Sequence, residues 1–185
     1  MAGKLFIISG SSGVGKGTVI KEFLNNAKSI YLSISSTTRM PREGEINGKN
    51  YFFITKEEFQ RDIENNNFLE WAEFSGNMYG TNKNRVLEML SQGKNVLLEI
   101  EVQGAKQIKQ KIPEAVSIFI LPPSKEELEK RLRNRGTETE EAIQRRLQAI
   151  EFEAKESDNY DYKVVNDIIA NAVNEILKIY EENKE

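Results

Sequence analysis

The chain of 185 residues contains neither cysteine nor histidine. Without cysteine there is no disulfide framework, no thiol nucleophile and no zinc–thiolate site. Without histidine, the commonest general base and metal ligand is missing as well. Any chemistry therefore runs on carboxylates, Arg, Lys, hydroxyls, backbone N–H groups or a bound metal ion. Reactions that depend on positioning and charge stabilisation fit this inventory best, and phosphoryl transfer is foremost among them.

Two further shortages narrow the class of protein. No run of about 18 apolar residues occurs, so nothing predicts a membrane-spanning helix. The apolar stretch near the N-terminus is too short for a signal peptide, and we expect a cytoplasmic protein that does not bind membranes. The formal net charge is −3, so no basic excess indicates a nucleic-acid partner. The composition, 38% hydrophobic and 30% charged, is typical of a globular protein.

Five short apolar segments, several of them rich in β-branched residues, indicate buried strands. They are Leu5–Ile8, Ile30–Ile34, Val96–Ile100, Val116–Leu121 and Tyr162–Val165. Helical patterns lie between them, and this alternation predicts a parallel α/β sheet. The expected helices are Lys16–Leu24, Lys56–Ile63, Lys83–Leu90 with a Thr81 N-cap and a Gly93 stop, a helix from the capping box Ser124–Glu127 through Arg131, Glu140–Glu156 and Ile168–Glu182.

Residues 36–82 interrupt this alternation. The segment contains Pro41, four glycines and aromatic, strand-like pieces at Tyr51–Ile54 and Phe68–Phe74. It predicts a small insertion with mixed or antiparallel strands. A second polar region, at residues 134–141, joins two helices and is flanked by arginines.

The stretch SGSSGVGKGT, residues 9–18, follows the first expected strand and precedes a helix, as a phosphate-binding loop requires. Small residues let consecutive backbone N–H groups turn inward around a phosphate, and the helix N-terminus adds partial positive charge. Lys16 would then reach the outer phosphates. In the usual pattern a Ser or Thr follows the lysine and binds Mg²⁺, whereas this chain has Gly17 and places a hydroxyl one residue later, at Thr18. An ordinary glycine-rich turn is the alternative interpretation.

A second polar cluster lies between Ser35 and Tyr51, where hydroxyls and two arginines share a glycine-punctuated loop. Arg39 and Arg42 are three residues apart, and two planar guanidinium groups converging on one site suit a dianionic phosphate. Tyr51 would add an O–H donor. Taken alone, the cluster is equally compatible with a solvated polar loop.

Together these motifs resemble the guanylate kinase family. Thr37-Thr-Arg-x-x-Arg-x-x-Glu-x-x-Gly-x-x-Tyr-x-Phe53 matches the family signature, and the resemblance extends over nearly the whole chain. The further motifs are EWA from Glu70, GNMYGT from Gly76, EIEVQG from Glu99, PPS from Pro122, RLRNRGTET from Arg131 and VVND from Val164. The resemblance implies a P-loop three-layer α/β/α fold with a five-stranded parallel core sheet. Its implied parts are a core (1–35, 83–133 and 158–185), a GMP-binding insertion (36–82) and a helical lid (134–157).

The family converts GMP and ATP to GDP and ADP, and the resemblance implies this reaction, with Mg²⁺, for the chain. The implied catalytic residues are Lys16, Arg39, Arg135 and Arg146. The implied ATP contacts are Gly10, Ser11, Ser12, Gly13, Val14, Gly15, Lys16, Gly17, Thr18, Arg131 and Asn166. The implied GMP contacts are Ser35, Arg39, Arg42, Glu45, Tyr51, Glu70, Tyr79, Thr81, Glu99 and Glu101.

Among these residues Glu70 has a particular chemical fit to guanine. A carboxylate can accept from guanine N1–H and the 2-amino group together, and adenine offers no such pair of donors. Two positions depart from the family pattern. Position 101 is more often Asp and is Glu here, and position 168, after Asn166 and Asp167, is usually a second Asp and is Ile here. No direct protein ligand to Mg²⁺ is expected, and Thr18, Glu99 and Glu101 would contact the ion at most through water.

Closure of the insertion and the lid over the two nucleotides is expected, because it would exclude water from the transfer. Three alternatives stay open at this point. The first is a non-catalytic guanylate-kinase-like binding module, although the chain keeps Lys16. The second is a kinase for another nucleoside monophosphate, which Glu70 argues against. The third is a GTPase switch, whose Asn-Lys-x-Asp motif is missing because Asn82-Lys-Asn is followed by Arg85.

Overall fold

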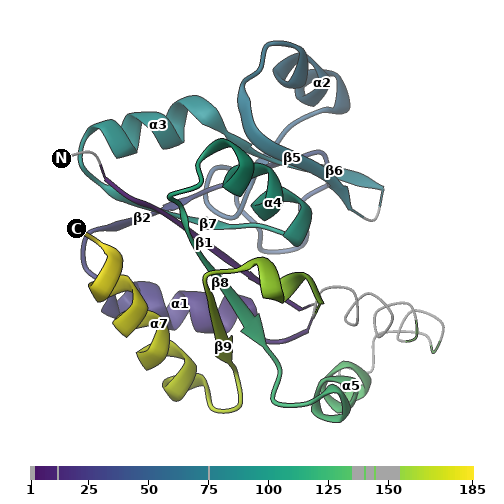
Figure 1. The fold of residues 1–185 in the computed structure, drawn as a ribbon. Helices are drawn as coiled ribbons and strands as arrows, with labels where there is room; N and C mark the ends of the chain where they lie inside the picture. The colour runs from purple at the N-terminus through teal and green to yellow at the C-terminus, as the bar shows by residue number, and fades with distance from the viewer. Residues whose placement is uncertain (1–2, 12, 75, 135–139, 141–143, 145–154) are drawn as a thin grey trace. The chain divides into compact units, whose positions relative to one another are not determined.

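The computed structural model describes residues 3–11, 13–74, 76–134, 140, 144 and 155–185 (Figure 1). Five strands form a parallel sheet in the order β2-β7-β1-β8-β9. Their bounds are β1 (Leu5–Gly10), β2 (Ile30–Ser33), β7 (Asn95–Glu99), β8 (Val116–Leu121) and β9 (Tyr162–Val165). Each strand agrees with its predicted segment to within two residues at either end, so the predicted α/β fold with a five-stranded core sheet is confirmed. The strands read as apolar runs because β1, β7 and β8 are almost wholly buried.

The chain divides into two compact units. The first comprises Met1–Ile7 and Ser29–Ala115. In it β2 pairs with β7, and two helices, α3 (Lys83–Ser91) and α4 (Val102–Lys111), flank β7 in sequence. Helix α4 was not predicted. Its buried residues Val102, Ala105 and Ile108 recur every three positions, a helical signal that the EIEVQG motif overlaps and obscures.

The first unit also contains the second sheet, in the order β4-β3-β6-β5. Its strands are β3 (Ser36–Thr37), β4 (Phe52–Phe53), β5 (Phe68–Phe74) and β6 (Asn77–Asn82). The β3–β4 pair is parallel and the other two pairs are antiparallel, which confirms the predicted mixed insertion. Helix α2 (Lys56–Glu64) lies between β4 and β5 in sequence and begins with a capping box between Thr55 and Glu58.

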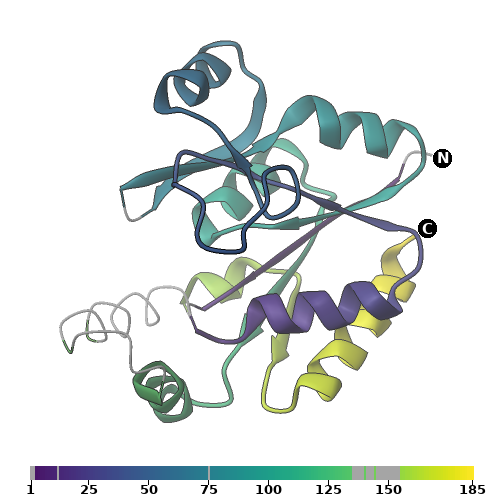
Figure 2. The same ribbon diagram turned by 180° about the vertical axis from the view of Figure 1, so that it is seen from behind.

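The second unit comprises Ile8–Lys28 and Val116–Glu185. Helices α1 (Lys16–Asn26) and α7 (Ile169–Asn183) run side by side, as Figure 2 shows from behind. Phe23 meets Tyr180 edge to face with ring centroids 5.8 Å apart, and the Tyr180 hydroxyl donates to the Lys28 carbonyl at 3.1 Å. Helix α5 (Lys125–Asn134) follows β8, and a 3₁₀ turn (Ser157–Asn159) precedes β9. The predicted helix at 140–156 lies almost entirely outside the described residues.

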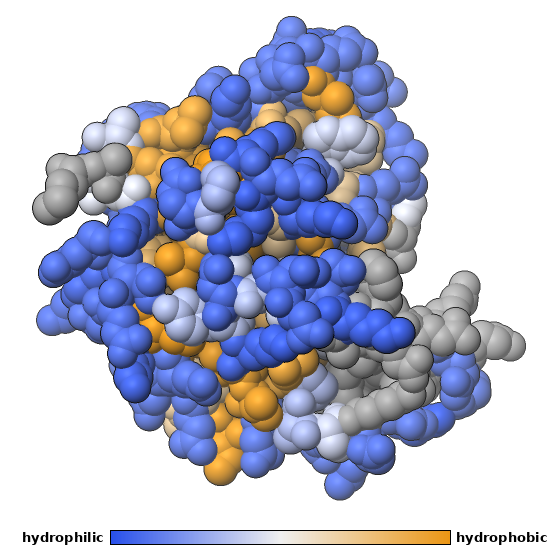
Figure 3. Space-filling model, viewed as in Figure 1, coloured by the Kyte–Doolittle hydropathy of each residue, from blue (hydrophilic) through white to orange (hydrophobic). Residues whose placement is uncertain are grey.

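On the face shown in Figure 3, hydrophilic side chains predominate and apolar ones form small patches among them. Within the described part of the chain, no helix combines the length and apolarity that a membrane crossing needs.

The N-cap of helix α3 differs from the predicted one, whereas the helix ends at the predicted glycine. Its N-cap is Asn82, whose Oδ1 accepts from the Arg85 N–H at 3.1 Å, so the predicted Thr81 cap was wrong. The helix ends in a Schellman motif, in which Gly93 N–H donates to Leu90 O and Lys94 N–H donates to Met89 O. Gly93 has φ 76°, a conformation that side chains with a Cβ rarely adopt.

We expect Gly93→Ala to destabilise the protein by about 1 kcal/mol, because alanine is strained in the left-handed region. For a chain of this size that corresponds to a fall in melting temperature of about 2–4 °C. Thermal unfolding followed by circular dichroism measures it. Gly93→Asn is the matched control, since asparagine tolerates this conformation, and equal losses in both variants would contradict the explanation.

Candidate active site

The glycine-rich loop of the second unit connects β1 to α1. Val14 N–H donates to Ser11 O at 3.1 Å inside the loop, and Gly13 and Gly15 have φ of 85° and 90°. Gly15 is the N-cap of α1 and makes no side-chain cap, so the first N–H groups of the helix are not covered by a capping side chain. No acidic side chain occupies the first turn. The loop and helix therefore present N–H groups and partial positive charge to an anion.

The close packing of this loop explains one glycine and leaves another without a steric reason. A Cβ at Gly10 would lie 2.8 Å from the Ile120 carbonyl oxygen of β8. A Cβ at Gly17 would meet no heavy atom within 4 Å. Position 17 is exposed in the first turn of α1, so the absence of a hydroxyl there is not imposed by packing.

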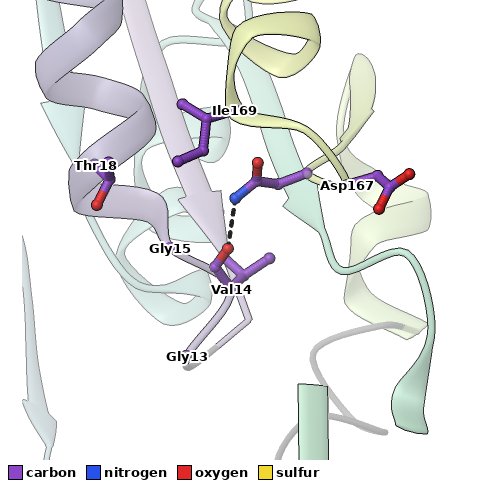
Figure 4. A pocket seen from close by; sticks show the side chains of 7 residues that line it. Gly13, Val14, Gly15, Thr18, Asp167 and Ile169 are labelled. Carbon is purple, nitrogen blue, oxygen red and sulfur yellow. Dashed lines mark hydrogen bonds between the residues drawn. The ribbon is translucent and has the colours of Figure 1, made fainter. Parts of the chain in front are cut away.

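Asn166 is buried behind the loop rather than displayed on the surface. Its Nδ2 donates to the Val14 carbonyl at 2.7 Å, the dashed line of Figure 4, and its backbone N–H donates to Leu121 O at 2.8 Å. A Cβ at Gly15 would lie 3.0 Å from that same Nδ2. The residue therefore braces the loop against β8, a role that the sequence motif did not reveal.

Beside this brace lies a pocket of about 300 Å³. Its lining, labelled in part in Figure 4, consists of Gly13, Val14, Gly15, Thr18, Asn166, Asp167 and Ile169. Ile169 contributes an apolar wall and Asp167 a carboxylate, so the pocket suits a flat polar group next to the phosphate loop. Contact of Asn166 with adenine remains a prediction.

In the first unit, the predicted phosphate cluster gathers around one arginine. The Arg39 guanidinium forms a two-pronged ion pair with Glu45, with N–O distances of 2.8 and 3.0 Å, and lies 5.4 Å from the centroid of the Tyr51 ring. The Tyr51 and Tyr79 ring centroids are 6.0 Å apart. Arg39, Glu45, Tyr51 and Tyr79 thus lie together, although they come from different parts of the insertion.

Glu45 fixes the orientation of this arginine. The hydrogen bonds from Arg39 and from the Arg42 backbone N–H lower the pKa of the Glu45 carboxyl to about 2. A guanidinium has five N–H donors, so the pairing leaves donors for a second anion. Arg42 is exposed, and its backbone rather than its guanidinium contacts Glu45. The structure therefore shows one oriented arginine here, where the sequence suggested two converging ones.

Glu70 on β5 is the buried carboxylate of this unit, with only 4% of its surface exposed. The Thr81 hydroxyl donates to Glu70 Oε1 at 2.5 Å from the neighbouring strand β6. Burial raises the pKa of Glu70 to about 7, against the lowering effect of the Thr81 hydrogen bonds and the Lys111 charge. A buried acid that titrates near neutrality is a candidate for ligand recognition.

The strand geometry at Glu70 is irregular. Phe68 pairs with Asn82 and Glu70 pairs with Thr81, so three residues of β5 span two of β6. Such a bulge re-aims side chains, and Phe68, Leu69 and Glu70 are all buried instead of alternating. No pattern in the sequence revealed this bulge.

The remaining predicted residues are less informative in this structure. Burial and the nearby Glu99 charge raise the pKa of Tyr51, which places Glu99 within electrostatic reach of the phosphate cluster. Ser35 is half-buried and its carbonyl accepts from Phe52 N–H; Glu101 is exposed and is the N-cap of α4. Arg135, Arg146 and Ser12 lie outside the described residues, and Arg131 is placed in α5 without a described side chain.

The polar region at residues 134–141 is flanked by arginines in the sequence. Arg133, near the end of α5, pairs on the surface with Glu129 of the same helix and with Glu140. The prediction did not consider Arg133.

Known proteins resemble this chain in both sequence and structure. The family model described as guanylate kinase matches residues 2–183. The chain is 56% identical to a guanylate kinase of Prochlorococcus marinus (strain MIT 9312), over 95% of this chain and 96% of the relative. It is 52% identical to one from Clostridium tetani, over 98% and 87%. The crystal structure of guanylate kinase from Anaplasma phagocytophilum superposes with a TM-score of 0.81 at 34% identity, covering 99% of this chain and 87% of that one.

The buried Glu70 makes the stability of the protein depend on pH. Its pKa is about 7 in the folded protein against 4.5 ordinarily, so between these values the folded state binds the proton and the unfolded state releases it. Stability contributed by this group is therefore full below about pH 4.5 and falls as the pH rises to about 7. We expect Glu70→Gln to gain stability relative to the parent protein by on the order of 3 kcal/mol between pH 4.5 and 8. Unfolding in urea across this range measures the difference, and a difference independent of pH would show that Glu70 is not perturbed.

Proposed function

The chain belongs to the guanylate kinase family, and from this premise we propose how its described residues divide the transfer of the ATP γ-phosphoryl group to GMP. The observation that carries the proposal is the buried Glu70, which lies in the same unit as the Arg39–Tyr51–Tyr79 cluster. A base-reading carboxylate and a phosphate-binding arginine are what a nucleoside monophosphate site needs. The relatives carry the name of an enzyme, so a non-catalytic binding module is not favoured.

GMP binds in the first unit. The Glu70 carboxylate accepts hydrogen bonds from guanine N1–H and from the 2-amino group. These bonds compensate for the hydration that the carboxylate loses by being buried. Thr81 and Ser35 contact the base beside it. Arg39, oriented by Glu45, and the hydroxyls of Tyr51 and Tyr79 hold the GMP phosphate, with Arg42 joining from its exposed position. Glu99 and Glu101 are further candidate contacts of GMP and would reach the metal ion at most through water.

ATP binds in the second unit. The loop from Gly10 to Gly15 and the N-terminus of α1 hold the phosphates, and Lys16 neutralises their outer oxygens. The pocket beside Asn166 accommodates the adenine. Asn166 supports the glycine-rich loop through its hydrogen bond to Val14. It therefore couples adenine binding to the conformation of the loop that holds the phosphates.

The transfer needs alignment and charge neutralisation more than a general base. The GMP phosphate oxygen that attacks is already anionic near neutral pH, which accords with a chain that has no histidine. In-line alignment of two bound reactants can supply roughly 7–11 kcal/mol of the barrier reduction. Lys16, Arg39 and the lid arginines Arg135 and Arg146 neutralise charge on the transferring group, and closure of the insertion and lid excludes water.

The residues present fit a Mg²⁺ ion that is carried by the nucleotide. Among the described residues no group of three or more acidic side chains could cage a metal, and the position after Lys16 carries no hydroxyl. Phosphate oxygens and water would supply the coordination, as Mg²⁺ prefers, with Thr18, Glu99 and Glu101 contacting that water. When bound, the ion would supply charge neutralisation to the phosphates.

We expect Glu70→Gln to raise the KM for GMP by roughly 10- to 100-fold, since losing a hydrogen bond to a charged group costs about 1.5–3 kcal/mol. The KM for ATP should change by less than about twofold, because Glu70 does not contact ATP. A coupled assay of ADP formation with GMP, AMP, CMP and UMP measures both parameters. Turnover by the parent protein with GMP alone supports the assignment, and equal effects on both nucleotides would mean that Glu70 does not read the base.

The metal proposal predicts different effects of substitution at two neighbouring positions. Thr18→Ala should leave the Mg²⁺ concentration that gives half-maximal rate unchanged within about twofold. Gly17→Ser should lower it, because the open space at position 17 accepts a side chain and the new hydroxyl can bind the ion. A strongly raised Mg²⁺ requirement in Thr18→Ala would identify Thr18 as a direct ligand and overturn the proposal.

A further inference from the structure

One face of helix α4 is turned toward the strand that carries Glu70. Gly104, Gln107 and Lys111 follow one another at spacings of three and four, so they share this face. Each of the three makes a close approach to β5 within the first unit. None was predicted as a site residue from the sequence.

Gln107 grips the backbone of the residue after Glu70. Its Nε2 donates to the Trp71 carbonyl at 2.8 Å, and its Oε1 accepts from the Trp71 N–H at 3.3 Å. One amide thus satisfies both polar groups of a single peptide position, as a neighbouring strand would. On the other side of Glu70, the Lys111 ammonium donates to the Leu69 carbonyl.

These contacts fall where the sheet constrains the strand least. Among the strands that the structure describes, β5 is at the edge of its sheet and pairs with β6 alone. The bulge at Phe68–Glu70 further weakens the register on that one paired side. The backbone that aims Glu70 is therefore fixed from its outer edge by side chains of α4 rather than by a strand.

Gly104 limits the carboxylate itself. A Cβ at this position would lie 2.4 Å from Glu70 Oε2 and 3.0 Å from its carboxyl carbon. The carboxylate consequently lies directly against the helix, in space that exists only because residue 104 has no side chain.

We propose that Gln107 is a positioning residue for guanine recognition: with Gly104, it holds the Glu70 carboxylate at the depth where it meets two guanine donors at once. Gln107 does not touch the nucleotide. The inference rests on the proposed role of Glu70 and extends it to α4. Inosine monophosphate, which lacks the 2-amino group, reports on the second donor directly.

The test compares Gln107→Met with Gln110→Met in the parent protein. Methionine keeps the length of the side chain and removes both hydrogen bonds, and Gln110 is an exposed residue of the same helix. For Gln107→Met we expect the preference for GMP over inosine monophosphate, measured as the ratio of kcat/KM values, to fall about tenfold. The KM for ATP should stay within about twofold, and Gln110→Met should match the parent protein in both measurements.

Gly104→Ala is a second variant that reaches the carboxylate without touching the Trp71 backbone. It should lower the same preference while ATP binding is retained, because the added methyl group displaces the Glu70 carboxylate. An unchanged GMP-to-inosine-monophosphate ratio in Gln107→Met would overturn the inference, even if overall activity fell.

Glu70→Gln, measured alongside, distinguishes a failure of the positioning role of Gln107 from a failure of the proposed role of Glu70. If it lowers the preference and Gln107→Met does not, only the positioning role of Gln107 is wrong. If Glu70→Gln leaves the preference intact, the proposed role of Glu70 is wrong and the inference fails with it.

Discussion

Glu70 is only 4% exposed, and the proposed site of the first unit depends on the burial of its carboxylate. Burying a carboxylate raises its pKa because the charged form loses hydration, and here the Thr81 hydroxyl and the Lys111 charge offset only part of that loss. Such a group is costly unless a ligand supplies the missing donors. Guanine supplies two on one edge. We propose that this cost of burial in the free protein is the basis of selectivity for guanine.

In the proposed mechanism, the two units carry separate halves of the reaction. In the first, we propose that Glu70 of the mixed sheet reads the base and that Arg39, in the loop after β3, binds the phosphate. In the second, the loop before α1 presents backbone N–H groups, and Asn166 supports that loop from behind. Every participant is a carboxylate, an amide, a hydroxyl, a lysine, an arginine or a backbone group. A reaction driven by alignment and charge neutralisation is possible with this inventory, and the absence of histidine and cysteine is no obstacle to it.

The parts of the fold that rest on local patterns were predictable from the sequence. Apolar runs in the sequence predicted the buried strands. The glycine-rich loop lies between a strand and a helix, as its motif requires. Glu70 was identified through a family motif, but its burial and its shifted pKa were not, because they depend on a bulge that only strand pairing defines. Helix α4 was not predicted, because its first residues were interpreted as part of the EIEVQG motif and the helical spacing of its buried residues was overlooked. The Arg39–Glu45 pair and the Asn166 brace were missed because each joins residues through contacts that no spacing rule describes.

Glu70 is a buried acid with a raised pKa, and we propose that guanine stabilises its charged form. The most direct measurement is an NMR titration of the Glu70 side-chain carboxyl carbon, with the signal assigned by its loss in a variant without this carboxylate. In the free protein the carboxyl should titrate near pH 7, well above the ordinary 4.5. With GMP bound, its pKa should fall clearly below that value, because the base donates to the ionised form. An ordinary pKa in the free protein, or one that GMP leaves unchanged, would contradict the account.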